Sequence, residues 1–596
     1  MKDQICELIR EALASLGDTV PPEARDVTPA VERTRDSSHG DFASNIALVL
    51  AKRVGKPPRE FASMLVEALP ASPLVERTEI AGPGFINFFM TSDATERTLL
   101  DVLDAGENYG KSDGGKGTRV LVEFVSANPT GPLHVGHGRG AAYGDCIAAL
   151  LEATGHDVSR EYYVNDAGRQ MDILAASTWL RYLELCGETL RFPSNGYRGS
   201  YVIDMAKALH DACGTELHHP AAAVMSDLPK DTLGEGEAAS AAAGEDGDKE
   251  AHIDAVINRA RTLLGADGYR RAFSLALDTM LDDIRDDLSE FGVEFDEWFS
   301  EQRLADEALV QRALDRLKDN DELYEKDGAT WFRATRYGDD KDRVVVRDNG
   351  QTTYIASDIA YHLNKRERGF DILLDVLGAD HHGYVARVRA GLAAMGEPAD
   401  SLDVQLLQFV ALYEGQQKVS MGTRGGKFVT LRELRGDVGN DVARFFYIMR
   451  SHDQHLDFDL ELARNQSDDN PVHYVQYAHA RMCSIFRQLE EQGLSWNEAG
   501  ARAHVDKLTT DHERALIATL GRFPEVVARG ADKRAPQVVA NYLHDLARDF
   551  HGFYNACKVL VNDAGMRDAR LVLVAATRQV IANGLTLLGV SAPQSM

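Results

Sequence analysis

Two histidines, His134 and His137, stand three residues apart with Gly136 between them. Side chains at this spacing share one face of an α-helix. At a helix N-terminus an imidazole can donate hydrogen bonds to phosphate oxygens, and the helix dipole stabilises the anionic charge. Gly136 leaves bare backbone beside which a flat ring can rest. The pair is therefore a candidate phosphate-binding site.

Metal binding is the alternative chemistry for two histidines at this spacing. A metal site needs further ligands, but no Cys or Glu close by in the sequence completes a set. The six cysteines are scattered and form no Cys-x-x-Cys motif, which is typical of free thiols in a reducing cytoplasm. We expect no metal centre here. Two incidental surface histidines remain the third possibility.

The residues around the pair predict a strand, a loop and a helix. The apolar run 119–125 indicates a buried strand, and a helical pattern extends over about 133–154, ending before Gly155. The histidines then lie at a strand-to-helix junction, where open α/β sheets bind nucleotides. A second apolar run, 370–377, predicts another buried strand, with 378–384 as a loop at its carboxyl edge.

Longer stretches carry a resemblance to a known family. The motif HVGH at 134–137, after such a strand, resembles the signature of class I aminoacyl-tRNA synthetases. The sequence segments EFVSANPTGPLH at 123–134 and YYVNDAGRQ at 162–170 resemble those of arginyl-tRNA synthetases specifically. The four-residue motif alone is a weak match, whereas the run 122–170 is long and specific.

The resemblance implies a multidomain α/β fold, in which a Rossmann-type parallel-sheet catalytic core carries an N-terminal α+β module and a C-terminal all-α anticodon-binding bundle. Helical patterns at 3–16 and 41–68 and a strand-like run at 84–90 suit the first module, with capping-type residues such as Asn45 opening the second helix. The expected ranges are 1–110 for the tRNA-contacting N-terminal domain, 111–190 and 301–460 for the catalytic domain, 191–300 for a mostly helical insertion with an acidic disordered loop near 231–250, and 461–596 for the bundle.

A substrate arginine presents a planar guanidinium with five N–H donors, which carboxylates and an aromatic ring recognise. Tyr354 and Asp358 share a helix face if a helix begins that early; otherwise they are a core ring and a helix charge. Such a pocket rejects lysine and citrulline, because buried carboxylates left unpaired are costly. The resemblance implies that Glu123, Tyr354 and Asp358 hold the arginine side chain, that Asn128 holds its α-amino and carboxylate end, and that His381 takes a place where many family members have Gln.

A second catalytic loop is expected at 420–427, where class I synthetases carry a mobile KMSKS-like loop that stabilises pyrophosphate. The usual second lysine is Thr423 here, and a lysine that other arginyl enzymes carry before the histidines is replaced by Gly131 and Pro132. We predict Arg424 as the catalytic cation, with Lys418 and Lys427 as alternatives; a Gly-rich surface turn is the alternative for the whole segment. The residues predicted to bind ATP are His134, Gly136, His137, Met421, Gly422, Thr423 and Arg424.

Contacts with tRNA are predicted where aromatic residues stand beside basic ones, because unstacked loop bases stack on such side chains. In the C-terminal helices this favours Tyr477 and Arg481, whereas Phe550 and Phe553 are predicted to be core. In the N-terminal module Asn45 is predicted to contact tRNA, with helix capping as the alternative. The net charge of −28 means that any RNA-binding surface must be locally basic.

The resemblance implies the activity of an arginine–tRNA ligase: ATP, with Mg²⁺, activates L-arginine to arginyl-adenylate, and arginine passes to tRNA(Arg) with release of AMP and pyrophosphate. No apolar run is long enough to span a membrane, and the N-terminus begins a charged amphipathic helix rather than a signal peptide. We expect a cytoplasmic monomer.

Three alternatives remain open. The first is a class I synthetase for another amino acid, which would lack the set Glu123, Tyr354 and Asp358. The second is a catalytically impaired RNA-binding relative, suggested by the missing lysine. The third is a small-molecule adenylate-forming ligase, which would need neither the N-terminal module nor the C-terminal bundle.

Overall fold

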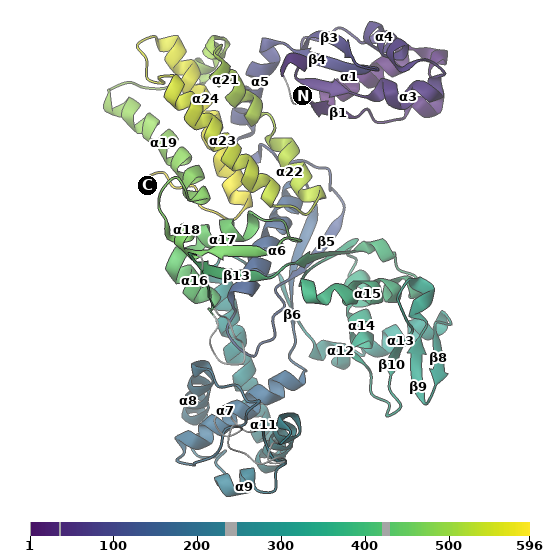
Figure 1. The fold of residues 1–596 in the computed structure, drawn as a ribbon, viewed down its shortest axis with the longest axis vertical. Helices are drawn as coiled ribbons and strands as arrows, with labels where there is room; N and C mark the ends of the chain where they lie inside the picture. Colours follow the sequence, from purple (N-terminus) through teal and green to yellow (C-terminus); the bar gives the residue numbers. More distant parts are fainter. Residues whose placement is uncertain (1, 35–36, 233–246, 416, 420–428) are drawn as a thin grey trace.

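The computed structural model describes residues 2–34, 37–232, 247–415, 417–419 and 429–596 (Figure 1). Two parts of the sequence discussed above lie outside these ranges. They are 233–246, within the acidic segment, and the whole of the expected second loop, 420–427, with Met421, Gly422, Thr423 and Arg424.

A five-stranded parallel sheet forms the centre of the molecule and confirms the predicted Rossmann-type core. The runs predicted as buried strands are β5 and β11, which are neighbours in the sheet. Strand order reverses between them, and such a switch point opens a crevice at the carboxyl ends of the strands. In sheet order the strands are β12 (Leu402–Leu407), β11 (Ile372–Gly378), β5 (Arg119–Phe124), β6 (Asp157–Val164) and β7 (Glu297–Ser300).

Alternation along β5 divides the two faces of this sheet, because successive side chains of a strand point to opposite sides. Val122 and Phe124 pack in the core formed with α6 (Val135–Ala153), whereas Leu121 packs on the opposite face, in the core formed with α14 (Tyr354–Glu367) and α15 (His382–Ala394). Helix α6 lies very close to the sheet, since a Cβ atom on Gly144 would stand 2.3 Å from Cγ of Phe124.

The N-terminal module contains a four-stranded antiparallel sheet in the order β1–β2–β4–β3. The single helix expected over 41–68 is wrong. Residues 42–44 pair with both neighbouring strands, and the helical remainder is broken at Gly55 (φ 70°), a left-handed cap followed by two prolines. The elements are α1 (Lys2–Ser15), α2 (Pro22–Arg25), β1 (Val31–Arg33), β2 (Phe42–Ser44), α3 (Ile46–Val54), α4 (Pro58–Ala68), β3 (Val75–Ala81) and β4 (Phe85–Met90), and α5 (Ser92–Ala105) follows.

A helical module projects from the core below the parallel sheet in Figure 1. Helix α7 follows β6 directly and packs on α8 and α11 rather than on the sheet. The long helix α11 returns to the core and is kinked at Gly265 (φ 62°, ψ −179°). The helices of this module are α7 (Arg169–Leu185), α8 (Ser200–Cys213), α9 (Ala221–Met225) and α11 (Lys249–Glu290).

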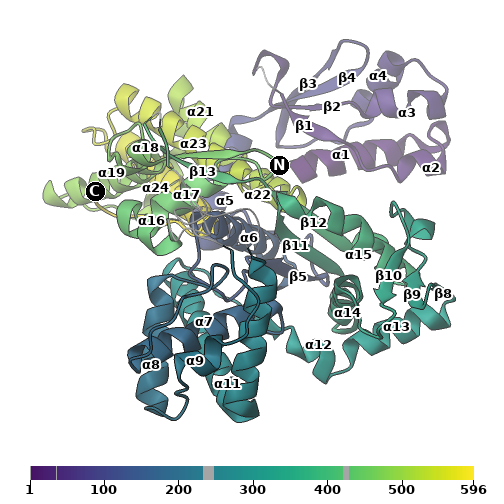
Figure 2. The ribbon, with the colours of Figure 1, turned by 60° about the horizontal axis from the view of Figure 1, so that its bottom comes forward.

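Two small sheets flank the core (Figure 2). One is antiparallel and follows α12 (Gln302–Asp306) and α13 (Leu309–Asp319); its strands are β8 (Leu323–Lys326), β9 (Ala329–Phe332) and β10 (Arg343–Val346). The other contains β13 (Val410–Glu414), β14 (Gln417–Lys418) and β15 (Leu456–Asp459), and it adjoins α16 (Leu431–Val438), α17 (Asn440–Ile448) and α18 (Leu460–Arg464).

The C-terminal part is helical, as predicted, and packs against α6 of the core and α5. Phe550 and Phe553 are fully buried, which confirms their assignment to the core. Within the described ranges, no helix is both long and apolar enough to span a membrane. The helices are α19 (Pro471–Glu491), α20 (Glu498–Ala501), α21 (Asp511–Leu520), α22 (Phe523–Asp532), α23 (Gln537–Ala556) and α24 (Ala564–Leu587).

The close approach of α6 to β5 predicts that Gly144→Ala destabilises the core, although Ala normally favours a helix. The added methyl group would overlap the ring of Phe124, and such overpacking costs about 1–3 kcal/mol. Gly436→Ala is the matched control, because this glycine of α16 has open space around it. This variant should gain up to about 1 kcal/mol in the free energy of unfolding. Calorimetric melting that leaves Gly144→Ala as stable as wild type would contradict the packing described.

Candidate active site at the carboxyl edge of the sheet

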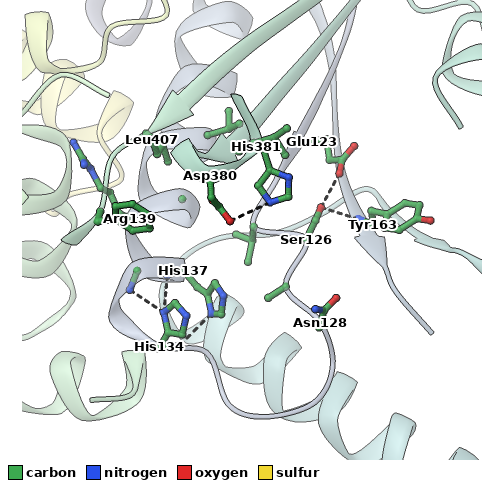
Figure 3. A pocket seen from close by; sticks show the side chains of 18 of the residues that line it. Glu123, Ser126, Asn128, His134, His137, Arg139, Tyr163, Asp380, His381 and Leu407 are labelled. Carbon is green, nitrogen blue, oxygen red and sulfur yellow. Dashed lines mark hydrogen bonds and ion pairs between the residues drawn. The ribbon is translucent and has the colours of Figure 1, made fainter. Parts of the chain in front are cut away.

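A cavity of about 640 Å³ opens at the switch point between β5 and β11 (Figure 3). Its walls are the carboxyl ends of β5, β6, β11 and β12, the first turn of α6 and one face of α14. The structure brings most of the predicted ATP- and arginine-binding residues of the described chain together here. Those that line the cavity are Glu123, Asn128, His134, Gly136, His137, Asp358 and His381.

The two histidines cap the N-terminus of α6 with their own side chains. Nδ1 of His134 accepts hydrogen bonds from the backbone N–H groups of Gly136 (3.1 Å) and His137 (3.3 Å). Nδ1 of His137 accepts one in return from the N–H of His134 (3.2 Å). The rings stack with centroids 3.6 Å apart (Figure 3). This reciprocal capping box fixes the orientation of both imidazoles.

The hydrogen bonds also fix the tautomer of each ring. A ring nitrogen that accepts from a backbone N–H carries no proton, so in the neutral imidazole the proton lies on Nε2. Burial lowers the pKa of His134, and burial together with the neighbouring His134 lowers the pKa of His137 to about 3. At neutral pH the pair therefore offers two uncharged Nε2–H donors at a helix N-terminus, which is the chemistry of a phosphate site.

A strained turn connects β5 to the histidine loop. Val125 and Ser126 both have positive φ angles, 67° and 40°, and such a conformation is a genuine outlier for a β-branched valine. The hydroxyl of Ser126 holds the turn, because it donates to Oε1 of Glu123 (3.0 Å) and accepts from the N–H of Tyr163 (3.1 Å). The turn therefore brings the backbone out of the sheet and along the cavity wall.

Glu123 lies in the cavity wall but is largely buried, with 6% of its surface exposed. Its second oxygen, Oε2, is 2.5 Å from Nζ of Lys365, a residue of α14 that is completely buried. The predicted ligand is thus already paired with a cation of the protein. Sequence reasoning missed both Lys365 and Ser126.

Asp358 is the contrasting carboxylate of the cavity. In the described part of the chain no side chain donates a hydrogen bond to its carboxylate or forms an ion pair with it. Burial, with a contribution from Glu123 and Glu301, raises its pKa to about 7, although His362 and Arg387 act in the opposite direction. Close by, Oε2 of Glu301 is buried with no hydrogen-bond partner among the described residues. Burial and Asp166 raise the pKa of Glu301, although Tyr163 and the backbone of Ala167 act in the opposite direction. Asp358 is therefore the carboxylate of the cavity wall that no cation of the described chain pairs.

The remaining predicted arginine ligands differ in position. Asn128 is exposed on the rim, and its Nδ2 donates to Oε1 of Gln170 (2.9 Å). His381 is also exposed, with its Nε2 3.8 Å from Asp380. Tyr354 is not among the lining residues and is 76% exposed. It is the first residue of α14, and its side chain therefore has no preceding helical turn to pack on.

The described residues on either side of the expected second loop form backbone hydrogen bonds. The N–H of Val419 donates to the carbonyl of Leu412 (2.9 Å), and the N–H of Leu431 donates to the carbonyl of Leu133 (2.8 Å). Thr430 forms an antiparallel bridge with His134. The residues that follow the expected loop, Thr430 and Leu431, therefore lie beside the histidine pair.

Helix α16 follows that segment and is tied to the end of α11 by ion pairs. Arg432 reaches Asp283 (2.9 Å) and Asp287 (2.8 Å), and Arg435 reaches Glu290 (2.7 Å). Arg432 is half exposed, whereas Asp287 is buried. The helical module is thereby connected to the anchor of the second loop.

The predicted tRNA-contacting residues lie far from this cavity in sequence and differ from one another. Arg481 donates to the hydroxyl of Tyr477 (2.6 Å), and its guanidinium lies over the rings of Tyr477 (4.4 Å) and Tyr554 (5.0 Å). This pair is accessible on α19. Asn45 caps no helix N–H with its side chain, and its Oδ1 is buried without a hydrogen-bond partner in the described chain.

A search of the described residues for three or more His, Cys, Asp or Glu side chains that could jointly hold a metal ion finds no such group. The cavity is also lined by side chains that the sequence did not single out. They are Tyr163 and Asn165, at the end of β6. Their position after parallel strands was the available signal.

Three family models match the chain. They are the arginyl tRNA synthetase N terminal domain over residues 3–90, the catalytic domain of class I (R) tRNA synthetases over 98–184 and 254–457, and the DALR anticodon binding domain over 475–596. Together they span the N-terminal module, the parallel-sheet core and the C-terminal helices.

Similar proteins extend over the full length. An arginine–tRNA ligase of Thioalkalivibrio sulfidiphilus is 57% identical over 597 residues, and one of Halorhodospira halophila is 53% identical over 598, with complete coverage of each chain. The arginyl-tRNA synthetase structure of Thermus thermophilus superimposes with a TM-score of 0.74 at 25% identity, covering 100% of both chains. The structure of a putative arginyl-tRNA synthetase of Campylobacter jejuni superimposes with a TM-score of 0.70 at 29% identity. The match covers 84% of this chain and 99% of the other. The chain therefore belongs to the arginyl-tRNA synthetase family of class I aminoacyl-tRNA synthetases.

Proposed function

We infer that this chain activates L-arginine with ATP and transfers it to tRNA(Arg). The observation that carries this conclusion is a cavity lined both by two Nε2–H donors at a helix N-terminus and by Asp358, a carboxylate without an ion-pair partner in the described chain. A phosphate ligand and a guanidinium ligand can bind there side by side. We propose that the enzyme acts in the cytoplasm as a monomer.

The first step joins arginine to AMP. The carboxylate of arginine attacks the α-phosphate of ATP, an adenylate forms, and pyrophosphate leaves. His134 and His137 hold phosphate oxygens through neutral Nε2–H donors, so their contribution comes from position and dipole. Mg²⁺ arriving with the nucleotide would offset phosphate charge. The segment 420–427, with Arg424 as its cation, is proposed to stabilise the leaving group, because Thr430, which follows the segment, forms a bridge with His134.

The guanidinium is directed towards Asp358. Glu123 accepts hydrogen bonds from it at the cavity wall, and Asn128 and His381 on the rim face the α-amino and carboxylate end. Tyr354 precedes Asp358 by one turn of α14 and covers the guanidinium by turning its ring from solvent into the cavity. A neutral citrulline would leave Asp358 without a countercharge, which explains rejection of that analogue.

Binding of tRNA involves the two ends of the molecule. Tyr477 and Arg481 offer a stacked aromatic–guanidinium pair on α19, which suits unstacked loop bases. The N-terminal module is proposed to contact the body of the tRNA. Asn45 is the weaker candidate there, because the oxygen it could present to RNA is buried.

The direct test is aminoacylation of tRNA with each standard amino acid, with and without magnesium. We expect stable aminoacyl-tRNA only with arginine and only with magnesium. Formation with another amino acid would assign a different specificity. Tight tRNA binding with no product from any amino acid would instead identify a catalytically impaired relative.

Replacement of His134 separates its capping role from its phosphate role. Asn is a good N-cap and keeps an acceptor for the backbone N–H groups, whereas Ala keeps neither function. We expect both His134→Asn and His134→Ala to lower arginine-dependent turnover by about 10²–10³-fold. Only His134→Ala should lose about 1 kcal/mol of stability. Initial rates and melting temperatures check this, and turnover of His134→Asn close to wild type would remove the imidazole from the reaction.

The raised pKa of Asp358 predicts pH-dependent recognition of arginine. Below about pH 7 the carboxyl group is protonated and lacks the charge that pairs with guanidinium. We expect kcat/KM for arginine to rise as pH increases through 7, by up to about tenfold per pH unit on the acid side. Asp358→Asn should give a low, pH-independent value.

Melting of the same variant provides the control. A carboxyl whose folded pKa lies above its unfolded value destabilises the fold as pH rises through the interval between the two. Asp358→Asn should therefore melt at or above the wild-type temperature at pH 8. A wild-type kcat/KM that is flat between pH 6 and 8 would contradict the assignment.

A further inference from the structure

Three carboxylates stand in a row beneath the cavity. Asp375 of β11, Glu123 of β5 and Glu161 of β6 are direct neighbours in the register of the sheet. All three lie on the face covered by α14 and are at most 6% exposed. Charges in adjacent strands about 5 Å apart repel by about 3 kcal/mol at an effective dielectric constant of 20. Such a row requires cations.

One face of α14 provides these cations. Nζ of Lys365 lies between Oε2 of Glu123 (2.5 Å) and Oδ1 of Asp375 (3.0 Å). Burial alone would lower the pKa of Lys365, but Asp375 and Glu123 raise it above its ordinary value. At the far end of the row, Arg368 binds Oε2 of Glu161 (2.6 Å).

The third basic group facing the row is His362. Its Nε2 faces Oδ2 of Asp375 (2.8 Å) and its Nδ1 faces the backbone carbonyl of Asp358 (2.9 Å). Both partners only accept hydrogen bonds, so each ring nitrogen of His362 faces an acceptor. Burial would raise the pKa of Asp375, but Lys365 and His362 lower it well below its usual range. Three carboxylates are thus faced by three basic side chains.

The charge balance of this row determines what the cavity offers a substrate. Glu123 is fixed on both oxygens, by Lys365 and by Ser126, and its charge is matched. Asp358, one turn before His362 on the same helix, has no such partner in the described chain. Buried ion pairs add little net stability compared with apolar packing, so the row is better explained by what it does to its neighbours.

We propose that Lys365 is a positioning residue for arginine recognition, which fixes Glu123 as an oriented acceptor and leaves Asp358 as the countercharge of the guanidinium. The inference rests on the proposed arginine specificity and extends it to a residue that does not touch the substrate. Lys365 acts through Glu123, whose charge faces Asp358 from β5. The other groups facing Asp358 are His362 on its own helix, Arg387 and Tyr384 of α15, Glu301 after β7 and Tyr163 of β6.

The test compares Lys365→Met with Arg368→Met in the full-length enzyme. Each variant removes one cation of the row, but Arg368 pairs with Glu161, which does not line the cavity. The readout is kcat/KM for arginine against pH, at saturating ATP and tRNA, with the KM for ATP as control. We expect Lys365→Met to shift the midpoint of this pH profile upward by about one pH unit, because unmatched Glu123 then disfavours ionisation of Asp358. The kcat/KM of the variant should be about tenfold below wild type near pH 7, and this difference should become smaller as pH increases.

Arg368→Met should keep the wild-type midpoint, even if it melts at a lower temperature. Equal shifts of the midpoint in both variants would mean that any cation of the row has the same effect. That outcome would overturn a specific positioning role of Lys365. An unchanged midpoint in folded Lys365→Met would overturn it too. A wild-type enzyme without arginine-dependent activity would instead refute the proposed function itself.

Lys365→Met can fail to fold, because it leaves two buried carboxylates against one another. The double variant Lys365→Met/Asp375→Asn removes one carboxylate together with the ammonium group, so the net charge of the row stays as in the wild-type protein. We expect it to melt near the wild-type temperature and yet to keep the raised midpoint, because Glu123 still lacks its ammonium partner. A wild-type midpoint in this folded variant would show that Lys365 has no positioning role.

Discussion

Buried like charges must be compensated, and in this structure that requirement determines where α14 lies. The carboxylates of Asp375, Glu123 and Glu161 are fixed by strand register, so a helix carrying His362, Lys365 and Arg368 must cover them. With α14 in that position, the turn that precedes His362 brings Asp358 to the cavity. The electrostatics of the sheet thus position a residue that contacts the substrate in our proposal.

The two halves of the proposed site rely on different interactions. Where we propose that phosphate binds, the histidines are donors whose direction comes from backbone hydrogen bonds at the start of α6. Where we propose that arginine binds, the orientation of Glu123 comes from its ion pair with Lys365, and Asp358 has no ion-pair partner among the described residues. Neutral donors would tolerate the approach of Mg²⁺, which a fixed cation would repel. In this proposal one crevice accommodates a polyanion and a cation together.

Much of this arrangement was accessible from sequence. The strand–loop–helix junction, the two buried strands and the burial of Phe550 and Phe553 follow from periodicity and motif spacing, whereas the parallel core and the C-terminal bundle were implied by the family resemblance. Glu123 and Asp375 were visible as charges inside apolar strands, but their partners on α14 depend on strand order and on which face the helix covers. The strand at 42–44 was hidden because its polar and apolar residues also suit a helix start. Tyr354 illustrates the limit of helical spacing, which puts two residues on one face without deciding how far each is buried.

The ion pairs between α11 and α16 have a consequence for the response of the enzyme to salt. Arg432 is half exposed, so added electrolyte screens its attraction to Asp283 and Asp286 much more than it screens the enclosed row around Lys365. Rising ionic strength therefore loosens the attachment between α11 and α16, while the buried ion pairs of Lys365 beneath the proposed arginine pocket are retained. The two ends of the catalytic domain thus differ in their sensitivity to salt.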